Sequence, residues 1–148
     1  MGDESIYKTG AWYTLKRENI GYLDQHYRTL NLLKSVIETM SEIVPHWFHA
    51  AIRNHLNDFL FRKNEEVTAQ MNNVSGGEKV RLSLAQIAAK TPELLILDEI
   101  TKNLNLETKS HVIQVLQCYL RTGMIISYEI DFLKEMRVEE VCVAQWRS

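Results

Sequence analysis

The stretch LLILDE, Leu94–Glu99, decides the fold class, because a short and continuous apolar run ends there in two carboxylates. Such a run predicts a parallel strand whose two faces are both buried. Two further apolar runs follow, within Gly123–Ser127 and Glu140–Ala144, and helical patterns separate the three runs at about Leu106–Leu120 and Ile130–Met136. Strands that alternate with helices predict an α/β fold with a parallel sheet.

The first half of the chain predicts different elements. Short strands are expected at Ala11–Leu15 and Asn19–Leu23, where strand-favouring residues gather, with Lys16–Glu18 as the turn between them. Apolar residues at helical spacing predict a mainly helical segment over residues 31–71. A further helix is expected over about Gly77–Lys90.

Length and composition exclude several classes of protein. A chain of 148 residues is one domain or a piece of one, and its net charge of −2 excludes nucleic-acid binding through bulk charge, so we expect no direct DNA binding. No apolar run approaches the roughly 18 residues of a membrane span. The acidic start Met1–Glu4 is unlike a signal peptide, and Cys118 and Cys142 are too few for a disulfide framework. We therefore expect a cytoplasmic protein in a reducing compartment, with both thiols buried.

The stretch VSGGEK, Val74–Lys79, carries the first chemical signal. Ser75 and Glu78 have the spacing of a capping box, which by itself predicts the start of a helix. A capping box needs no glycines, and Gly76 and Gly77 weaken a helix. Bare glycines at a helix start let an anion approach the free backbone N–H groups, where the helix dipole favours phosphate. Both interpretations, a plain helix start and a phosphate site, stay open from these residues alone.

The two carboxylates that end the first apolar run are the second signal. The carboxyl edge of a parallel sheet is where open α/β folds bind ligands. Asp98 suits a Mg²⁺ shell there, since Mg²⁺ prefers oxygen ligands, and Glu99 has the chemistry to orient or deprotonate an attacking water. The alternative is a strand followed by a solvated acidic turn, and this pair alone does not decide between the two.

The spacing of the two signals is more specific than either one. Ser-Gly-Gly-Glu, a helix, the Pro92–Glu93 loop and an apolar strand ending in Asp-Glu resemble the signature motif and Walker B strand of an ATP-binding cassette (ABC) ATPase. Gln25 then resembles the Q-loop glutamine of that family. Its ABC-F subfamily consists of soluble paired cassettes. Three further stretches resemble that subfamily: NDFLFR, LDEITKNLN and ISYEIDFL, at Asn57–Arg62, Leu97–Asn105 and Ile126–Leu133.

The resemblance implies a partial P-loop NTPase-like ABC nucleotide-binding domain, with a parallel sheet and a helical signature subdomain. Residues 10–148 would form the C-terminal portion of one ABC ATPase domain, with Q-loop strands over 10–30, the helical subdomain over 31–73, and the signature, Walker B and switch core over 74–148. ATP and Mg²⁺ are the implied cofactors. The implied site residues are, for nucleotide, Gln25, Ser75, Gly76, Gly77 and Glu78; for Mg²⁺, Asp98 and Gln25; and for catalysis, Glu99 and Tyr128 at the switch position.

Several positions depart from the family pattern. No G-x-x-x-x-G-K-[ST] phosphate loop occurs in the sequence, which begins after the point where the family carries that loop. Tyr128 stands where the switch histidine is usual, and Asn105 replaces the D-loop aspartate. We therefore expect weak nucleotide affinity or none, and no ATPase activity, from this chain alone.

Two functions are compatible with this pattern. In the first, the chain contributes its signature and Walker B motifs to a nucleotide site that a partner cassette completes. In the second, it is a catalytically inactive remnant or an interaction module that docks on a cassette partner or on a ribosome. The resemblance also implies that the sheet lacks a neighbouring strand, so we expect an apolar edge and self-association. The side chains expected to be most exposed are Ile96, Leu97, Ile125 and Ile126.

Overall fold

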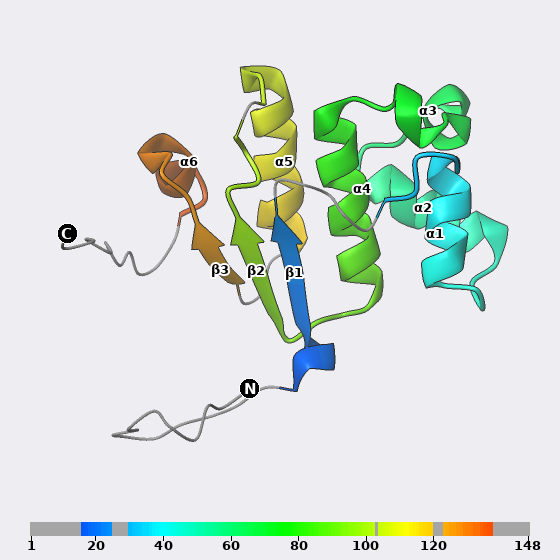
Figure 1. Ribbon diagram of the computed structural model, residues 1–148, viewed down its shortest axis with the longest axis horizontal. Helices are drawn as coiled ribbons and strands as arrows, with labels where there is room; N and C mark the ends of the chain where they lie inside the picture. The colour runs from blue at the N-terminus through cyan, green and yellow to red at the C-terminus, as the bar shows by residue number, and fades with distance from the viewer. Residues whose placement is uncertain (1–15, 25–29, 103, 120–122, 138–148) are drawn as a thin grey trace.

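The computed structural model describes residues 16–24, 30–102, 104–119 and 123–137, in which three strands lie beside a group of helices (Figure 1). The elements in chain order are the 3-10 turn η1 (Arg17–Asn19), β1 (Ile20–Asp24), α1 (Val36–Ile43), α2 (His49–Asp58), α3 (Asn64–Thr68), the 3-10 turn η2 (Met71–Asn73), α4 (Gly76–Ala89), β2 (Leu94–Asp98), α5 (Leu106–Tyr119), β3 (Gly123–Ile126) and α6 (Ile130–Glu135). None of these described helices is long and apolar enough to cross a membrane. The strands expected at Ala11–Leu15 and Glu140–Ala144 lie outside the described residues.

The sheet is parallel and has the order β1-β2-β3, which confirms the predicted α/β class. Leu97 of β2 pairs with Leu23 of β1 on one side and with Ile125 of β3 on the other. Helices make both connections between the strands, as parallel pairing requires. The apolar run of β2 is therefore the central strand. β1 begins at Ile20, because the preceding Asn19 still belongs to the η1 turn.

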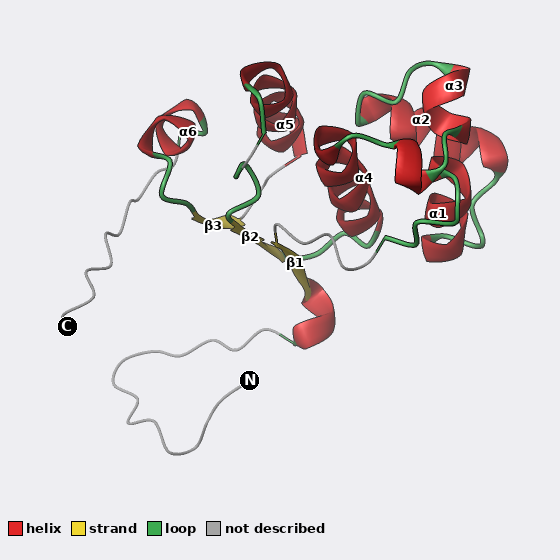
Figure 2. Ribbon diagram, turned by 45° about the horizontal axis from the view of Figure 1, so that its top comes forward, coloured by secondary structure: helices red, strands yellow, loops and turns green. Residues whose placement is uncertain are grey.

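The α-helices cover one face of this sheet (Figure 2). On the covered face Leu23 and Leu97 are buried, whereas on the opposite face Tyr22, Met124 and Ile126 are 54%, 53% and 48% exposed. The expectation of a sheet buried on both faces is therefore wrong for the described part of the chain. The physical reason is that successive strand residues point to opposite faces, so a continuous apolar run does not specify how many faces are covered.

The prediction of which side chains are exposed along the sheet is wrong in part. Leu97 is fully buried, Ile96 and Ile125 are half-buried, and Ile126 is exposed. β2 is paired on both sides, so the covered face of the central strand is shielded by its neighbours and by the helices. The exposed apolar surface lies on the uncovered face instead, where Met124 joins Ile126.

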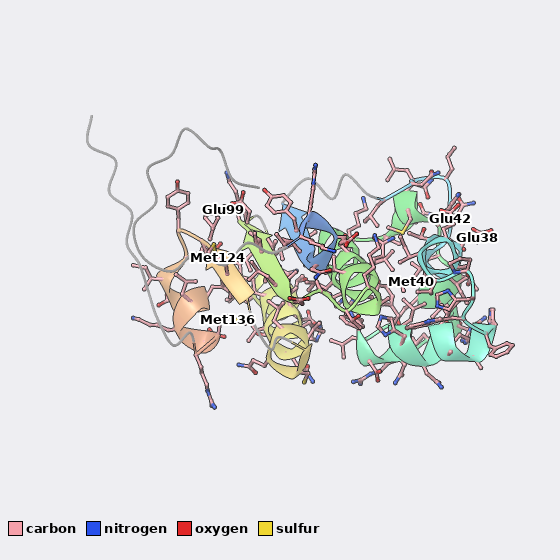
Figure 3. The ribbon with its side chains drawn as sticks, turned by 90° about the horizontal axis from the view of Figure 1, so that it is seen from below. Glu38, Met40, Glu42, Glu99, Met124 and Met136 are labelled. Carbon is pink, nitrogen blue, oxygen red and sulfur yellow. The ribbon has the colours of Figure 1, made fainter. Side chains whose placement is uncertain are left out.

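The segment predicted to be helical over residues 31–71 contains the short helices α1, α2 and α3. On α1, Met40 points into the core of this segment, while Glu38 and Glu42 lie on its outer side (Figure 3). Other buried side chains of this core are Val36, Leu56, Phe59, Phe61, Val67 and Met71.

Backbone hydrogen bonds join the two ends of this helical segment. The N–H of Val36 donates to the carbonyl of Ala69 at 3.1 Å, and the N–H of Met71 donates to the carbonyl of Lys34 at 2.9 Å. These bonds satisfy backbone groups at the start of α1 and the start of η2. The two ends of the helical segment therefore lie side by side.

Helix α4 connects the helical segment to the sheet. It packs against α1 and α2 on one side and against β1 and α5 on the other, and Val80, Leu82 and Ala85 are fully buried in these contacts. β1 passes so close that a Cβ on Gly21 would lie 2.4 Å from Ile87 Cγ2. Glycine suits that crossing, because a larger residue would force the Ile87 side chain or the strand to shift.

Helix α5 carries the one cysteine of the described residues, and it is exposed. The expectation that Cys118 is buried is wrong, because Val112, Val115 and Leu116 form the buried face of the helix. Cys142 lies outside the described residues.

Candidate functional site

The carboxyl end of β2 and the amino-terminal ends of α4 and α5 lie at the same end of the molecule (Figure 1). The loop after β2 brings Leu104 to the start of α4, where its Cδ2 would lie 3.8 Å from a Cβ on Gly76. Thr108 in the first turn of α5 packs directly against Gly77. The structure therefore places the two predicted signals, the Ser75–Glu78 turn and the Asp98–Glu99 pair, at the same end of the molecule.

Asp98 ends β2 and is held from the neighbouring strand. Tyr22 of β1 pairs with Ile96, and its hydroxyl donates to Asp98 Oδ2 at 3.0 Å. The phenol therefore restrains the carboxylate at the carboxyl edge of the sheet. Sequence reasoning missed Tyr22, because the two residues are 76 positions apart and only the strand register brings them together.

Glu99 is the most constrained residue of this edge. Its φ angle of 51° lies in the left-handed region, which residues other than glycine rarely adopt. Its backbone N–H donates to the carbonyl of Ile126 at 2.9 Å, and its side-chain Oε1 accepts the backbone N–H of Tyr128, also at 2.9 Å. Two bonds from the end of β3 and the turn after it therefore hold Glu99 beside that strand (Figure 3).

The switch position contributes its backbone to this arrangement. The N–H of Tyr128 contacts Glu99, whereas its side chain is 86% exposed. The turn is closed by Glu129, whose N–H donates to Ser127 Oγ at 3.0 Å. Lys109 Nζ of α5 donates to Glu129 Oε2 at 2.6 Å. Sequence reasoning missed Lys109 and Glu129, which no local spacing connects.

The start of α4 has the predicted capping box. Ser75 Oγ accepts the N–H of Glu78 at 3.3 Å, and Glu78 Oε2 accepts the N–H of Ser75 at 2.8 Å. The two glycines have different surroundings, since a Cβ on Gly77 would lie 1.9 Å from Thr108 Cγ2, whereas one on Gly76 would meet nothing closer than 3.8 Å. Close helix packing therefore accounts for Gly77, and it leaves Gly76 without a steric reason to be glycine.

Arg81, one turn further along α4, ties the signature helix to the NDFLFR stretch. Its Nη1 donates to the carbonyl of Leu60 at 3.0 Å, and its guanidinium lies 5.1 Å from the centre of the Phe61 ring. Burial lowers the pKa of Arg81, and the nearby carboxylates of Glu78 and Glu66 oppose that shift.

Asn105 and Gln25 are the two remaining predicted positions. Asn105, at the D-loop position, precedes α5, and its Oδ1 accepts the N–H of Thr108 at 2.8 Å, which is a helix cap that asparagine and aspartate both make well. Gln25 lies outside the described residues.

The chemistry of Asp98 and Glu99 fits a magnesium ion that is shared with phosphate. No three His, Cys, Asp or Glu side chains come together among the described residues, so no all-protein metal cage is present there. Mg²⁺ commonly takes one or two carboxylates, several waters and phosphate oxygens. Asp98 at the end of a strand is therefore a suitable carboxylate donor for Mg²⁺ that arrives with a nucleotide, and the neighbouring Glu99 adds negative charge there.

A family profile described as ABC transporter matches residues 3–102 of the chain. The chain belongs to the ABC transporter family. The match contains both the Ser75–Glu78 turn and the strand Leu94–Asp98, so the predicted resemblance to this family is confirmed.

Relatives of this cassette include proteins named for ATP binding. The ATP-binding protein Uup of Buchnera aphidicola subsp. Schizaphis graminum is 33% identical over 138 residues, which cover 90% of this chain and 23% of the relative. The probable ATP-binding protein YheS of Haemophilus influenzae is 32% identical over 133 residues, covering 89% of this chain and 20% of the relative. Homology to Uup and YheS confirms the predicted ABC-F relationship. The cassette spans about a fifth of the length of these relatives.

A solved structure has the same fold. The dimeric ATP-binding cassette MJ0796, in a post-hydrolysis state bound to ADP and phosphate, matches with a TM-score of 0.63 and 18% identity, over 78% of this chain and 55% of that one. The predicted P-loop NTPase-like cassette fold is therefore confirmed.

Proposed function

We propose that this chain contributes its signature turn and its Walker B carboxylates to ATP sites that a second ABC-F cassette completes. The observation that carries the proposal is the position of the glycine-bearing start of α4 at the same end of the molecule as Asp98 and Glu99. A backbone without a Cβ at residue 76 leaves room for a phosphate to approach the N–H groups of the first turn. In this proposal residues 10–148 are the C-terminal portion of one ABC ATPase domain, with the boundaries given above.

Each residue has a distinct role in the proposed site. Ser75 and Gly76 face the phosphates of a nucleotide held by the partner, and Asp98 holds Mg²⁺, either directly or through water. Glu99 orients the water that attacks the terminal phosphate. Gln25 links the nucleotide and Mg²⁺ to the helical subdomain. When bound, Mg²⁺ neutralises phosphate charge, and the protein groups supply position and orientation.

The surface at this edge suits contact with another protein. Leu106, Tyr128 and Ile130 are large apolar side chains at the starts of α5 and α6, and all three are exposed. Large apolar side chains that are exposed to solvent favour an interface when a partner covers them. The dimeric state of the MJ0796 cassette supports a second cassette as the partner. A cytoplasmic location and paired ATP sites follow from the ABC-F relationship as part of this proposal.

The proposal is tested by mixing the chain with a complete ABC-F cassette that carries its own phosphate loop, and by measuring complex formation with and without Mg-ATP by analytical ultracentrifugation. We expect a complex that requires ATP. Gly76→Asp should abolish it, because an acidic residue suits a helix start but repels phosphate. Asn54→Asp adds the same charge to an exposed position of α2 and is the matched control. The proposal would be overturned if the complex formed equally well without ATP and with the Gly76→Asp variant.

The chain alone should bind nucleotide weakly and show no ATPase activity, since its sequence contains no phosphate loop. Isothermal titration with Mg-ATP measures this directly. Micromolar affinity, worth about 8 kcal/mol, would mean that other residues bind the phosphates.

The second candidate function is an interaction module without catalysis, docking on a cassette or on a ribosome. Tyr128 favours this alternative, because it stands where the family carries a histidine and its side chain is exposed to solvent. Under this alternative the complex with the second cassette forms with equal affinity in the presence and absence of ATP, or the chain co-sediments with ribosomes and not with the cassette.

A further inference from the structure

Glu99 adopts a backbone conformation that costs free energy and needs outside support. A non-glycine residue at φ 51° is held there only when surrounding contacts over-determine it. The contacts are the two bonds from Ile126 and Tyr128. The first belongs to the end of a strand, whereas the second comes from the turn of residues 127–129 after that strand. The position of the Glu99 carboxylate therefore depends on what fixes this turn.

An ion pair fixes the turn. Glu129 is the N-cap residue of α6, but its side chain makes no capping bond to that helix. Its carboxylate instead accepts Lys109 Nζ at 2.6 Å, and the two side chains are only 25% and 34% exposed. Partial burial reduces screening by solvent and salt, so this pair is a stronger restraint than a pair on an open surface.

Lys109 is itself well placed to act as an anchor. It lies in the first turn of α5, where Asn105 Oδ1 caps the helix through the N–H of Thr108. Thr108 packs against Gly77 of the signature turn. The same helical turn therefore contacts the signature on one side and restrains the switch turn on the other.

We propose that Lys109 and Glu129 are positioning residues for Glu99. The ion pair holds the turn of residues 127–129 so that the Tyr128 N–H stays bonded to the Glu99 carboxylate, which keeps that carboxylate aimed at the edge of the sheet. The inference rests on the proposed role of Glu99 in orienting water. Its structural part, the dependence of the Tyr128–Glu99 bond on the ion pair, is measurable without nucleotide.

The first experiment measures amide hydrogen exchange of Tyr128 in the full 148-residue chain by NMR. We expect Lys109→Gln and Glu129→Gln each to speed exchange at this amide, because a freed turn opens more often. The charge-reversed double variant, Lys109→Glu with Glu129→Lys, should restore much of the protection. Lys134→Gln removes an exposed lysine from α6 and should leave exchange unchanged.

The second experiment measures ATP turnover by the chain together with a complete ABC-F cassette. Loss of positioning lowers kcat and leaves KM for ATP unchanged. An unfolded fraction would lower the apparent kcat in the same way, so turnover is compared only between variants that are folded. Thermal melts identify any variant that fails to fold. If Lys109→Gln fails to fold, the test uses Glu129→Gln, because glutamine has the size of glutamate and keeps a hydrogen-bond acceptor.

The outcomes separate this inference from the proposed function. Unchanged Tyr128 exchange in both single variants overturns the inference. Faster exchange with an unchanged kcat also overturns it, because the pair is then a structural contact alone. If the wild-type mixture shows no turnover, the proposed function fails, and the exchange measurement still decides whether the pair holds the Tyr128–Glu99 bond.

Discussion

Replacing Gly77 with alanine tests how closely the signature turn packs on α5. A Cβ at this position would lie 1.9 Å from Thr108 Cγ2 and 3.0 Å from both Thr108 Cβ and Oγ1. Rotating the threonine does not move its Cβ, so α4 and α5 must separate. Overpacking costs about 1–3 kcal/mol, and alanine offsets about 0.5–1 kcal/mol of this because it is the better helix former. We expect the free energy of unfolding to fall by about 1–2 kcal/mol.

The neighbouring glycine provides the matched control. A Cβ on Gly76 would meet Leu104 Cδ2 at 3.8 Å, which is ordinary van der Waals contact. Gly76→Ala should therefore raise the free energy of unfolding by up to about 1 kcal/mol. In the Gly77→Ala background, Thr108→Ala removes Cγ2, the atom in closest contact, and Oγ1 but keeps Cβ, so it should recover part of the loss. The double-mutant cycle then reports the contact itself.

Urea unfolding followed by circular dichroism gives the free energies, and thermal melts provide a second measure. For a chain of this size, each kcal/mol corresponds to a shift of about 2–4 °C in Tm. The reasoning is refuted if Gly76→Ala and Gly77→Ala change stability equally, or if Thr108→Ala recovers nothing. Either result would mean that the two helices adjust at no cost.

Three further predictions concern other parts of the molecule. Arg81→Met removes the hydrogen bond to Leu60 and should lower the free energy of unfolding by about 2 kcal/mol in urea titrations; an unchanged midpoint would contradict this. The backbone hydrogen bond from Ser35 in the capping box of α1 is the chief cause that lowers the pKa of Glu38 below 4.5. The ionised Glu38 carboxylate therefore stabilises the folded chain fully above pH 4.5, and this contribution is lost as the pH falls below that value. Glu38→Gln should flatten the fall of Tm below that pH, and a parallel pair of curves would refute the assignment. Met124→Lys combined with Ile126→Lys should reduce self-association in light scattering across a concentration series, whereas unchanged scattering would place any association elsewhere.

Local sequence patterns predict much of the second half of the fold. The pattern predicts a helix over about Gly77–Lys90, and α4 spans Gly76–Ala89. The start of this helix is predictable because both partners of a capping box lie within four consecutive residues of the sequence. The apolar runs of β2 and β3 are equally local, since a few buried residues between turn residues define each strand.

Contacts between distant residues do not follow from such patterns. The Tyr22–Asp98 bond joins residues 76 apart, and the Lys109–Glu129 pair joins residues 20 apart. Each depends on strand register or on how two helices lie beside the sheet, and neither has a local signature. The sequence also does not predict which face of the sheet the helices cover, because a continuous apolar run contributes similar side chains to both faces.

The first turn of α5 explains how distant motifs are kept in place. Asn105 caps the turn, Thr108 contacts Gly77 of the signature, and Lys109 pairs with Glu129 of the switch turn. These three residues lie at the start of α5, so a single helical turn contacts both Gly77 of α4 and Glu129 of the turn before α6. A displacement of the α5 start would alter the signature packing and the Glu99 restraint together. The geometry of the candidate site is therefore a property of this turn as much as of the motif residues themselves.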